Sequence, residues 1–372
     1  MISSFAFPTA ILHGPGAMRE LPERLSAMGT EDAKRPLIVT DAGLLSTPTF
    51  ESLHAILPKA AVFSGVHPNP LEPDVEAAAA AYREHGCDSV IGFGGGSALD
   101  VAKIVRAAVA GSVPRWSELT WKDQPGALAP FIAIPTTAGT GSEVGRSSVI
   151  TFGTTKRVIF HPELLARLVI LDPEVTAGLP PKLTAATGAD AIVHCIESFT
   201  SPVFHPLCDA IAIEGFRIGC RYLPRAVEHG ADLEARGMML MAATMGGIAF
   251  QKDLGAVHSL SHPLSAHFGI HHGLANALCL LPVMRFNAER KPGLYRRLAV
   301  ALDLADPSDA SFIASMAGLL DRVGLTGGLR TQGVSKDDLP TLADAAFADS
   351  SHATNPVPVT RDDLQDLYAQ AL

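Results

Sequence analysis

The sequence predicts an α/β domain built on a mostly parallel, doubly wound sheet, followed by an all-helical domain. In the first half of the chain, short β-branched runs alternate with helical stretches, which is the order typical of such sheets. After Pro180–Pro181 the strand-like runs nearly vanish, and apolar residues recur at spacings of three and four. We therefore expect domains of 1–181 and 182–372, each long enough to bury its own core.

Local patterns predict the elements in order. The apolar N-terminus is interrupted by Pro8, Gly14 and Pro15, which favours a first strand and turn rather than a signal peptide. Strands are expected over 36–41, 60–66, 88–93 and 131–134, helices over 46–57, 73–86 and from Ser97, and further strands with a hairpin over 147–171. Helices should follow from Lys182 to about Asn287, then a loop at SSHATNPVPVT and a closing helix at RDDLQDLYAQAL.

Composition narrows the class of partner. A formal net charge of −9 disfavours nucleic acid and anionic membrane surfaces, and no apolar run is long enough to predict a spanning helix. The five cysteines are scattered without CxxC spacing, so we expect reduced thiols in a cytoplasmic protein and no thiolate metal site. A small-molecule partner remains the main expectation.

Two polar loops each follow a predicted strand. Strand 88–93 runs into Gly94-Gly95-Gly96-Ser97 and then a helix, and glycines at a helix N-terminus let the backbone approach a pyrophosphate. The second loop, after strand 131–134, supplies the hydroxyls of Thr136, Thr137, Thr140 and Ser142. Both loops should lie at the carboxyl edge of the sheet, where ligands bind in open α/β sheets. Alternatively, the glycines only allow a tight connection between strand and helix, and the hydroxyls only form the hydrogen bonds of turns and helix caps.

Asp41 ends the strand 36–41. A carboxylate there can accept both ribose hydroxyls of an adenosine and would repel a 2′-phosphate, so it predicts NAD rather than NADP. A helix or turn cap is the alternative role.

A carboxylate and several imidazoles in the second half of the chain are candidate metal ligands. Asp190 and His194 are four residues apart, so on a helix they share one face. Five of the fourteen histidines fall within 258–272, a density that core packing does not explain. Imidazole and carboxylate ligands suit a first-row divalent metal.

His258 and His272 would complete a set of four ligands with Asp190 and His194. His262 is a further candidate, since it stands four residues after His258. Four protein ligands plus an open position fit Fe(II) better than Zn(II), which usually keeps three protein ligands in catalytic sites. Zn(II) remains possible.

Four motifs in order, GGGSALDVAK (94–103), IPTTAGTGSEV (134–144), TAATGADAIVHCIES (184–198) and HSLSHPLSAHFGIHHGLANA (258–277), resemble the iron-containing, group III alcohol dehydrogenases. The similarity extends over nearly the whole chain. It implies a dehydroquinate synthase-like architecture, with an N-terminal dinucleotide-binding domain and a helical domain that binds the metal.

The resemblance also assigns individual positions. It implies that Asp190, His194, His258 and His272 are the metal ligands, while His262 lies near the nicotinamide as a proton relay or a packing group. Residues expected to line the cofactor are Asp41, Asn69, Gly94, Gly95, Gly96, Ser97, Asp100, Thr136, Thr137, Thr140, Ser142 and Lys156.

Three positions leave alternatives open. His271 stands where the family commonly has proline. It can be a solvent-side residue, a group that supports the site or an alternative ligand. Val357 follows Asn355-Pro356 where many members have arginine, which leaves the charge preference for substrate open. Glu197 either holds an imidazole N–H or serves as a helix-surface or capping residue.

The expected activity is reversible hydride transfer between a small alcohol or diol and NAD, with Fe(II) or Zn(II) bound. One alternative is a lyase or cyclase resembling dehydroquinate synthase, which uses NAD and zinc with a glutamate and two histidines. Another is a non-catalytic, cofactor-binding structural protein. Pairing of the N-terminal strand favours a homodimer or a higher homo-oligomer.

Overall fold

The computed structural model describes residues 9–27, 35–111, 115–120, 122–153 and 155–372, which form two compact units. The first, called the α/β unit, runs to Thr137 and resumes over Gly141–Leu179. The second, called the helical unit, contains Ala138–Thr140 and Pro180–Leu372. The main division between the two units falls at Pro180.

A six-stranded sheet forms the centre of the α/β unit, in the order β1-β8-β5-β4-β2-β3 with every pairing parallel. Its strands are β1 (Ala10–His13), β2 (Pro36–Val39), β3 (Ala61–Phe63), β4 (Ser89–Gly94), β5 (Phe131–Pro135) and β8 (Leu168–Leu171). The helices are α1 (Leu21–Ala27), α2 (Pro48–Ile56), α3 (Glu72–Glu84) and α4 (Gly96–Ala110). The predicted parallel sheet is confirmed.

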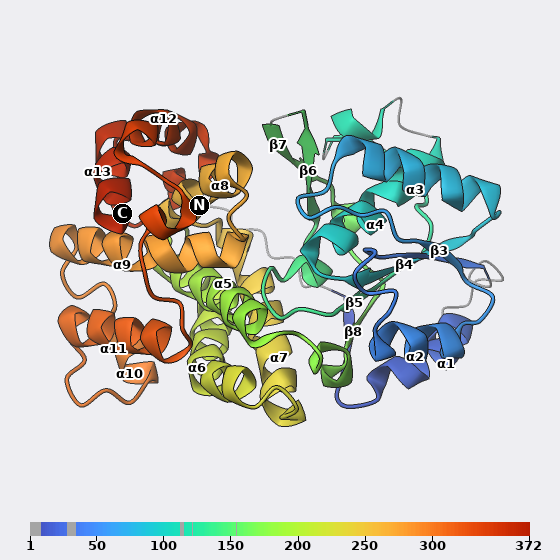
Figure 1. Ribbon diagram of the computed structural model, residues 1–372, viewed down its shortest axis with the longest axis horizontal. Coiled ribbons are helices and arrows are strands. Elements are labelled where there is room, and N and C mark those ends of the chain that lie inside the picture. Colours follow the sequence, from blue (N-terminus) through green and yellow to red (C-terminus); the bar gives the residue numbers. More distant parts are fainter. Residues whose placement is uncertain (1–8, 28–34, 112–114, 121, 154) are drawn as a thin grey trace. The chain divides into compact units, whose positions relative to one another are not determined.

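Helices cover both faces of this sheet (Figure 1). Ile38, Ile91 and Phe93 point to the face where α1 and α2 pack. The opposite face meets α4 so closely that a Cβ on Gly92 would lie 2.9 Å from Leu99 Cδ2 and 3.1 Å from Ala102 Cβ. The alternation of side chains along each strand thus gives two apolar faces, and the doubly wound arrangement buries both.

The expected hairpin is formed by β6 (Ser147–Phe152) and β7 (Thr155–Phe160), which pair antiparallel in a separate two-stranded sheet. It is tied to α4 through Asp100. The Ser148 hydroxyl donates to the Asp100 carbonyl at 2.9 Å, and the Val149 N–H donates to Asp100 Oδ2 at 3.0 Å. Lys103 adds a third bond, from its Nζ to the Ser147 carbonyl at 2.7 Å, so two residues of α4 fix the hairpin against the helix that starts at the glycine loop.

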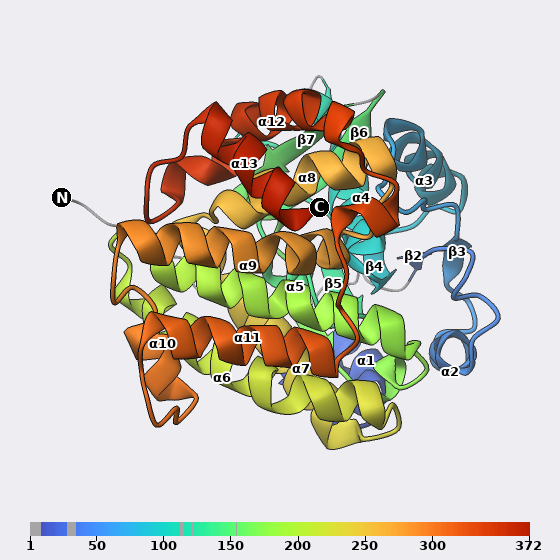
Figure 2. The same cartoon turned by 60° about the vertical axis from the view of Figure 1, so that its left-hand side comes forward.

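Nine helices carry the labels α5 to α13 in the helical unit, where the structure describes residues 138–140 and 180–372. They are α5 (Pro181–Thr200), α6 (Pro206–Glu228), α7 (Leu233–Ala249), α8 (Ala256–Phe268), α9 (His272–Arg290), α10 (Arg296–Ala301), α11 (Asp309–Arg322), α12 (Leu339–Ala348) and α13 (Arg361–Ala371). Figure 2 shows α5 and α9 side by side. Helix α5 is buried along most of its length, against α6, α7 and α9.

The tail expected to be a loop contains the 3-10 helix η9 (Ser350–Thr354). Asp349 caps it by accepting the Ser351 N–H at 2.8 Å. The following stretch, through Asn355 to Thr360, has no regular structure, and α13 closes the chain as expected. Within the described residues, no helix has both the length and the apolarity of a transmembrane span.

Candidate metal centre and cofactor loops

Helix α5 supplies two of the expected metal ligands. Pro181 opens the helix in its first turn, where a missing N–H costs nothing. Asp190 and His194 then lie one turn apart, both buried, with His194 Nε2 3.8 Å from Asp190 Oδ1. The predicted shared helix face is confirmed.

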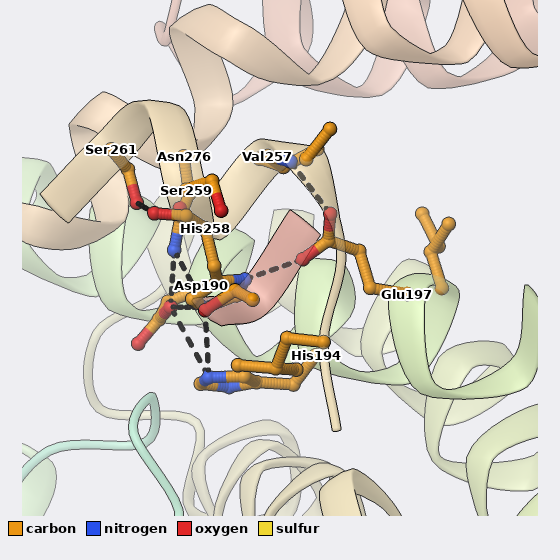
Figure 3. Close-up of polar contacts among 12 residues, drawn as sticks. Asp190, His194, Glu197, Val257, His258, Ser259, Ser261 and Asn276 are labelled. Carbon is orange, nitrogen blue, oxygen red and sulfur yellow. Dashed lines mark hydrogen bonds and ion pairs between the residues drawn. The ribbon is translucent and has the colours of Figure 1, made fainter. Parts of the chain in front are cut away.

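Helices α8 and α9 bring the other two ligands to the same place. His258 Nε2, from α8, lies 3.1 Å from His194 Nε2 and 3.8 Å from Asp190 Oδ1 (Figure 3). His272 is the first residue of α9, and its Nε2 lies 3.5 Å from Asp190 Oδ1. The donor atoms of Asp190, His194 and His258 all lie within 4.8 Å of one another, close enough to share one ion. The structure thus gathers all four residues, and this carboxylate and imidazole set fits a first-row divalent metal.

Close helix packing makes this convergence possible. A Cβ on Gly273 would lie 2.0 Å from the Ala186 carbonyl oxygen and 3.2 Å from Asp190 Cβ. Only glycine therefore lets the start of α9 approach α5 at the level of Asp190.

Glu197 orients the His258 ring. Its Oε2 lies 2.6 Å from His258 Nδ1, and its Oε1 accepts the Val257 N–H at 2.7 Å (Figure 3). The first contact directs Nε2 of His258 toward Asp190, as supporting carboxylates do in metal sites. The second caps the first turn of α8. Glu197 is buried, so of its alternative roles the helix surface is wrong, while holding an imidazole and capping are both observed.

Asn276 is a further member of the cluster that sequence reasoning missed. Its Nδ2 donates to Asp190 Oδ1 at 2.7 Å (Figure 3). The same nitrogen lies 3.3 Å from Nε2 of both His258 and His272. Asn276 is fully buried on α9, four residues after His272. That spacing places both side chains on one helix face and was the available signal.

Charges in the cluster separate the pKa values of its members. Burial acts to raise the pKa of Asp190, but His194, His272 and His258 outweigh it and hold the pKa well below its usual range. Burial lowers the pKa of His194 to about 4, against the opposing effect of Asp190. Burial also acts against the His258 cation, but Asp190 and Glu197 outweigh it and raise the pKa of His258 to about 9.

His262 lies beside this cluster with a partner of its own. Its ring stacks on His272 with centroids 5.3 Å apart and planes 13° apart, and its Nδ1 lies 2.8 Å from Asp349 Oδ2. Asp349 immediately precedes the tail, and sequence reasoning did not place this residue in the site. His271 is exposed at the N-cap of α9, as expected for a solvent-side residue.

In the α/β unit, the two predicted loops lie next to each other. The Thr136 N–H donates to the Gly94 carbonyl at 3.0 Å, and a Cβ on Gly95 would lie 3.4 Å from Thr137 Oγ1. Gly94 has φ +155°, and a Cβ there would lie 2.7 Å from Ala98 Cβ. Any residue other than glycine is therefore disfavoured at position 94. The turn leads from there through Gly95 and Gly96 into α4.

Asp41 lies within reach of this turn. Its Oδ2 is 3.7 Å from the position of a Cβ on Gly94. Its Oδ1 accepts the Gly43 N–H at 2.9 Å, so the turn-capping role considered for it is also real. One carboxylate oxygen fixes the turn and the other faces the glycine loop.

Ser142 and Asp100 stabilise the second loop from inside. Ser142 Oγ donates to Asp100 Oδ1 at 2.6 Å and accepts from Lys103 Nζ at 2.7 Å, and all three residues are buried. The Ser142 hydroxyl, which was expected to contact a phosphate of the cofactor, is therefore engaged in hydrogen bonds that join α4 to the loop. Lys103 was not anticipated from the sequence.

Asn69 and Lys156 come together although they are far apart in the sequence. Lys156 Nζ donates to Asn69 Oδ1 at 2.7 Å, and burial lowers the pKa of Lys156. Asn69 has φ +56°, in a turn that Asp74 holds through the His67 and Leu71 N–H groups. Thr140 belongs to the helical unit, whereas the other residues expected to line the cofactor belong to the α/β unit.

Comparison with protein families covers most of the chain. The family described as iron-containing alcohol dehydrogenase matches residues 8–173, and the C-terminal part of the Fe-containing alcohol dehydrogenase family matches residues 184–372.

Among individual relatives, the 4-hydroxybutyrate dehydrogenase of Cupriavidus necator is 39% identical over 357 residues, covering 91% of this chain and 92% of the relative. The NAD-dependent methanol dehydrogenase of Bacillus methanolicus is 33% identical and covers 100% of both chains. The crystal structure of a 1,3-propanediol oxidoreductase superposes with a TM-score of 0.94 at 32% identity, covering 100% of both chains. A sulfoacetaldehyde reductase from Bifidobacterium kashiwanohense, in complex with NAD⁺, has a TM-score of 0.89 at 30% identity, covering 100% of this chain and 99% of that one.

Proposed function

The chain belongs to the iron-containing alcohol dehydrogenase family and is an NAD-dependent oxidoreductase acting on CH–OH groups, and we propose that its substrate is a small, uncharged alcohol or diol. We further propose that Asp190, His194, His258 and His272 hold the metal. The observation that carries this proposal is the convergence of one carboxylate oxygen and three imidazole Nε2 atoms from three helices.

The metal, when bound, supplies a Lewis acid that polarises the alcohol oxygen and lowers its pKa. The residues around it have separate tasks. Glu197 and Asn276 keep His258 and Asp190 aimed at one point, which reduces the reorganisation needed on binding. His194 is neutral above about pH 4, so its Nε2 is ready to act as a ligand.

The α/β unit would hold the dinucleotide. The Gly94–Ser97 turn offers N–H groups at the start of α4 for the pyrophosphate. Asp41 Oδ2 would accept ribose hydroxyls and repel a 2′-phosphate, which supports NAD as the cofactor. Lys156 and Asn69, joined by their hydrogen bond, would form one wall of the same site.

A neutral substrate is supported by Val357. This side chain packs against the core of the helical unit, where many family members have arginine. Without that cation, the site has no charged partner at this position for a carboxylate or sulfonate on the substrate. We therefore propose a small alcohol or diol, in contrast to the acid in the name of the Cupriavidus relative.

The test is metal analysis of anaerobically purified protein, followed by NADH production from a panel of alcohols, diols and hydroxy acids. We expect about one iron or zinc ion per chain and turnover with small neutral alcohols. His258→Ala should lose both metal and activity. Near-native turnover of His258→Ala reconstituted with Fe(II) would show that the ligand assignment is wrong.

The same assay separates the alternatives. A dehydroquinate synthase-like lyase would produce no net NADH, and a structural protein would give no turnover at all. The ligand arrangement already differs from a glutamate and two histidines, because Glu197 contacts the Nδ1 side of His258 while Asp190 lies among the Nε2 atoms.

For assembly and location, we propose a homodimer in the cytoplasm. Strand β1 lies at an edge of the sheet and pairs only with β8 among the described strands, so its other edge can pair with a second copy. All five cysteines are free, which suits a reducing compartment. Analytical ultracentrifugation that finds a monomer at micromolar concentration would contradict the dimer.

A further inference from the structure

Asp349 and His262 form a hydrogen-bonded pair beside His272. Asp349 lies between α12 and η9, and His262 lies on α8, yet Asp349 Oδ2 is 2.8 Å from His262 Nδ1. The side chain of His262 is 33% exposed and that of Asp349 is 23% exposed, so the pair is partly shielded from water.

The orientation of the Asp349 carboxylate is fixed independently of His262. Its Oδ1 accepts the Ser351 N–H at 2.8 Å and the Ser259 hydroxyl at 3.1 Å. Ser259 in turn accepts the His352 N–H at 2.8 Å. Burial acts to raise the pKa of Asp349, but the contacts of His262 and Ser351 outweigh it and hold that pKa well below its usual range.

An ionised carboxylate can only accept hydrogen bonds, so Nδ1 of His262 must be the donor. In the neutral imidazole the other nitrogen, Nε2, then keeps its lone pair. Among the described residues, no hydrogen-bond partner of Nε2 is found, while stacking on His272 fixes the plane of the ring. The pair therefore offers one oriented acceptor beside an expected metal ligand.

We propose that Asp349 is a positioning residue for the reaction: it holds His262 in the Nδ1–H tautomer so that Nε2 accepts a hydrogen bond from a hydroxyl of the bound reactants. This inference rests on the proposed alcohol oxidation. In that reaction the hydroxyl is that of the alcohol substrate, and a fixed acceptor sets its position relative to the reacting carbon.

The substitution Asp349→Asn separates this role from helix capping. The Ser351 N–H is a donor, so the introduced amide must direct its oxygen to Ser351, and asparagine caps helices as well as aspartate. The amide nitrogen then faces Nδ1 of His262 and donates to it. Asp349→Asn should therefore keep the cap but move the ring proton from Nδ1 to Nε2.

The experiment is NMR of the full chain labelled with ring-¹⁵N histidine, at about pH 8.5, about two units above the pKa of histidine in model peptides. The His262 signals are identified by their loss in His262→Asn. In the native protein we expect the proton on Nδ1, and in Asp349→Asn on Nε2. Asp232→Asn is the matched control, because Asp232 also caps a helix, α7, through the Ala235 N–H.

Kinetics on the same variants give the second readout. Asp349→Asn should lower kcat about 10- to 100-fold with KM for NAD⁺ changed less than about twofold, since the acceptor matters for hydroxyl alignment and not for dinucleotide affinity. Asp232→Asn should leave the kcat, the KM and the His262 signals unchanged.

Three results would overturn the proposal: an Nε2–H tautomer in the native protein, an unchanged tautomer in Asp349→Asn, or a switched tautomer with unchanged kcat. The tautomer measurement needs no turnover. If the native protein oxidises none of the alcohols tested, the proposed function fails, while the NMR result still decides whether Asp349 controls His262.

Discussion

Glu197 Oε2 lies 2.6 Å from His258 Nδ1, and its other oxygen accepts the Val257 N–H at 2.7 Å. The backbone donor fixes which way a glutamine at this position can face. In Glu197→Gln the amide oxygen must serve Val257, so the amide nitrogen donates to Nδ1 and moves the ring proton to Nε2, the ligand atom.

We expect Glu197→Gln to weaken metal binding about 10- to 100-fold, the range found when such supporting residues are changed. Competition with a chelator, followed by metal content, measures the effect. Glu214→Gln on α6 is the control, since Glu214 is half-exposed and contacts Arg217. Equal metal affinity in the two variants would contradict the role of Glu197.

Asn276 gives a second prediction about the metal. Asn276→Leu removes the donor to Asp190 Oδ1 while keeping the number and branching of the side-chain heavy atoms. The carboxylate loses its orientation, so metal affinity should fall about tenfold, which the absorption of a Co(II)-substituted sample can follow by titration. If Asn276→Leu binds Co(II) as tightly as the native protein, the amide does not position Asp190.

The pKa of His258 predicts how the metal-free protein responds to pH. This pKa is raised from 6.5 to about 9, so the protonated ring stabilises the fold. That stabilisation is fully present below pH 6.5 and is lost as the pH rises through about 9. Thermal unfolding of chelator-treated protein should therefore show a falling Tm over this window.

The affinity for the metal should rise with pH over the range in which the stability of the metal-free protein falls. The metal must displace the proton on His258, whereas His194, with its pKa lowered to about 4, is already neutral. Apparent affinity should rise about tenfold per pH unit from about pH 7 and level off above about pH 9. A flat profile between these values would show that His258 carries no proton in the metal-free site.

A pair of glycine substitutions tests the approach of α9 to α5. Gly273→Ala places a Cβ 2.0 Å from a backbone oxygen of α5, so the helices must separate. We expect a loss of about 2 kcal/mol or more in unfolding free energy, together with weaker metal binding. Gly318→Ala on α11 has no atom within 4 Å of the new Cβ and should instead stabilise by about 0.5–1 kcal/mol. Similar effects of both changes would contradict the close approach.

Asp41 gives a prediction on cofactor choice. Asp41→Asn keeps an oxygen for the Gly43 N–H but removes the charge that faces the glycine loop. Because a like charge near 4 Å costs about 1–4 kcal/mol, kcat/KM for NADP⁺ should rise at least about fivefold. Comparable efficiency of the native enzyme with NAD⁺ and NADP⁺ would exclude this role for Asp41.

Much of the fold follows from local patterns in the sequence. The alternation of β-branched runs and helices predicted the parallel sheet, because each strand such as β4 has apolar side chains on both faces. The tail was predicted less well. Its 3-10 turn at Ser350–Thr354 depends on one cap from Asp349, and such short turns have no periodicity to detect.

The site was predictable where residues share a helix or lie in the motifs that resemble the family, and unpredictable where other segments meet across the fold. Asp190 and His194 stand out by their spacing, and Asn276 stands at the same spacing from His272. Asp349 lies 87 residues after His262, so no local pattern could join them. Ser142 shows the reverse case, because its hydroxyl was expected to face a ligand and instead bonds Asp100 and Lys103.

The side chains of the four proposed ligands differ in exposure, and this difference bears on how an ion could enter or leave. Those of Asp190, His194 and His258 are at most 6% exposed, whereas that of His272 is 26% exposed. An entering or leaving ion, or an attacking chelator, therefore has its route past His272, at the first turn of α9. We therefore expect movement of the His272 ring to control how fast a bound ion is replaced, independently of how tightly the ion is held.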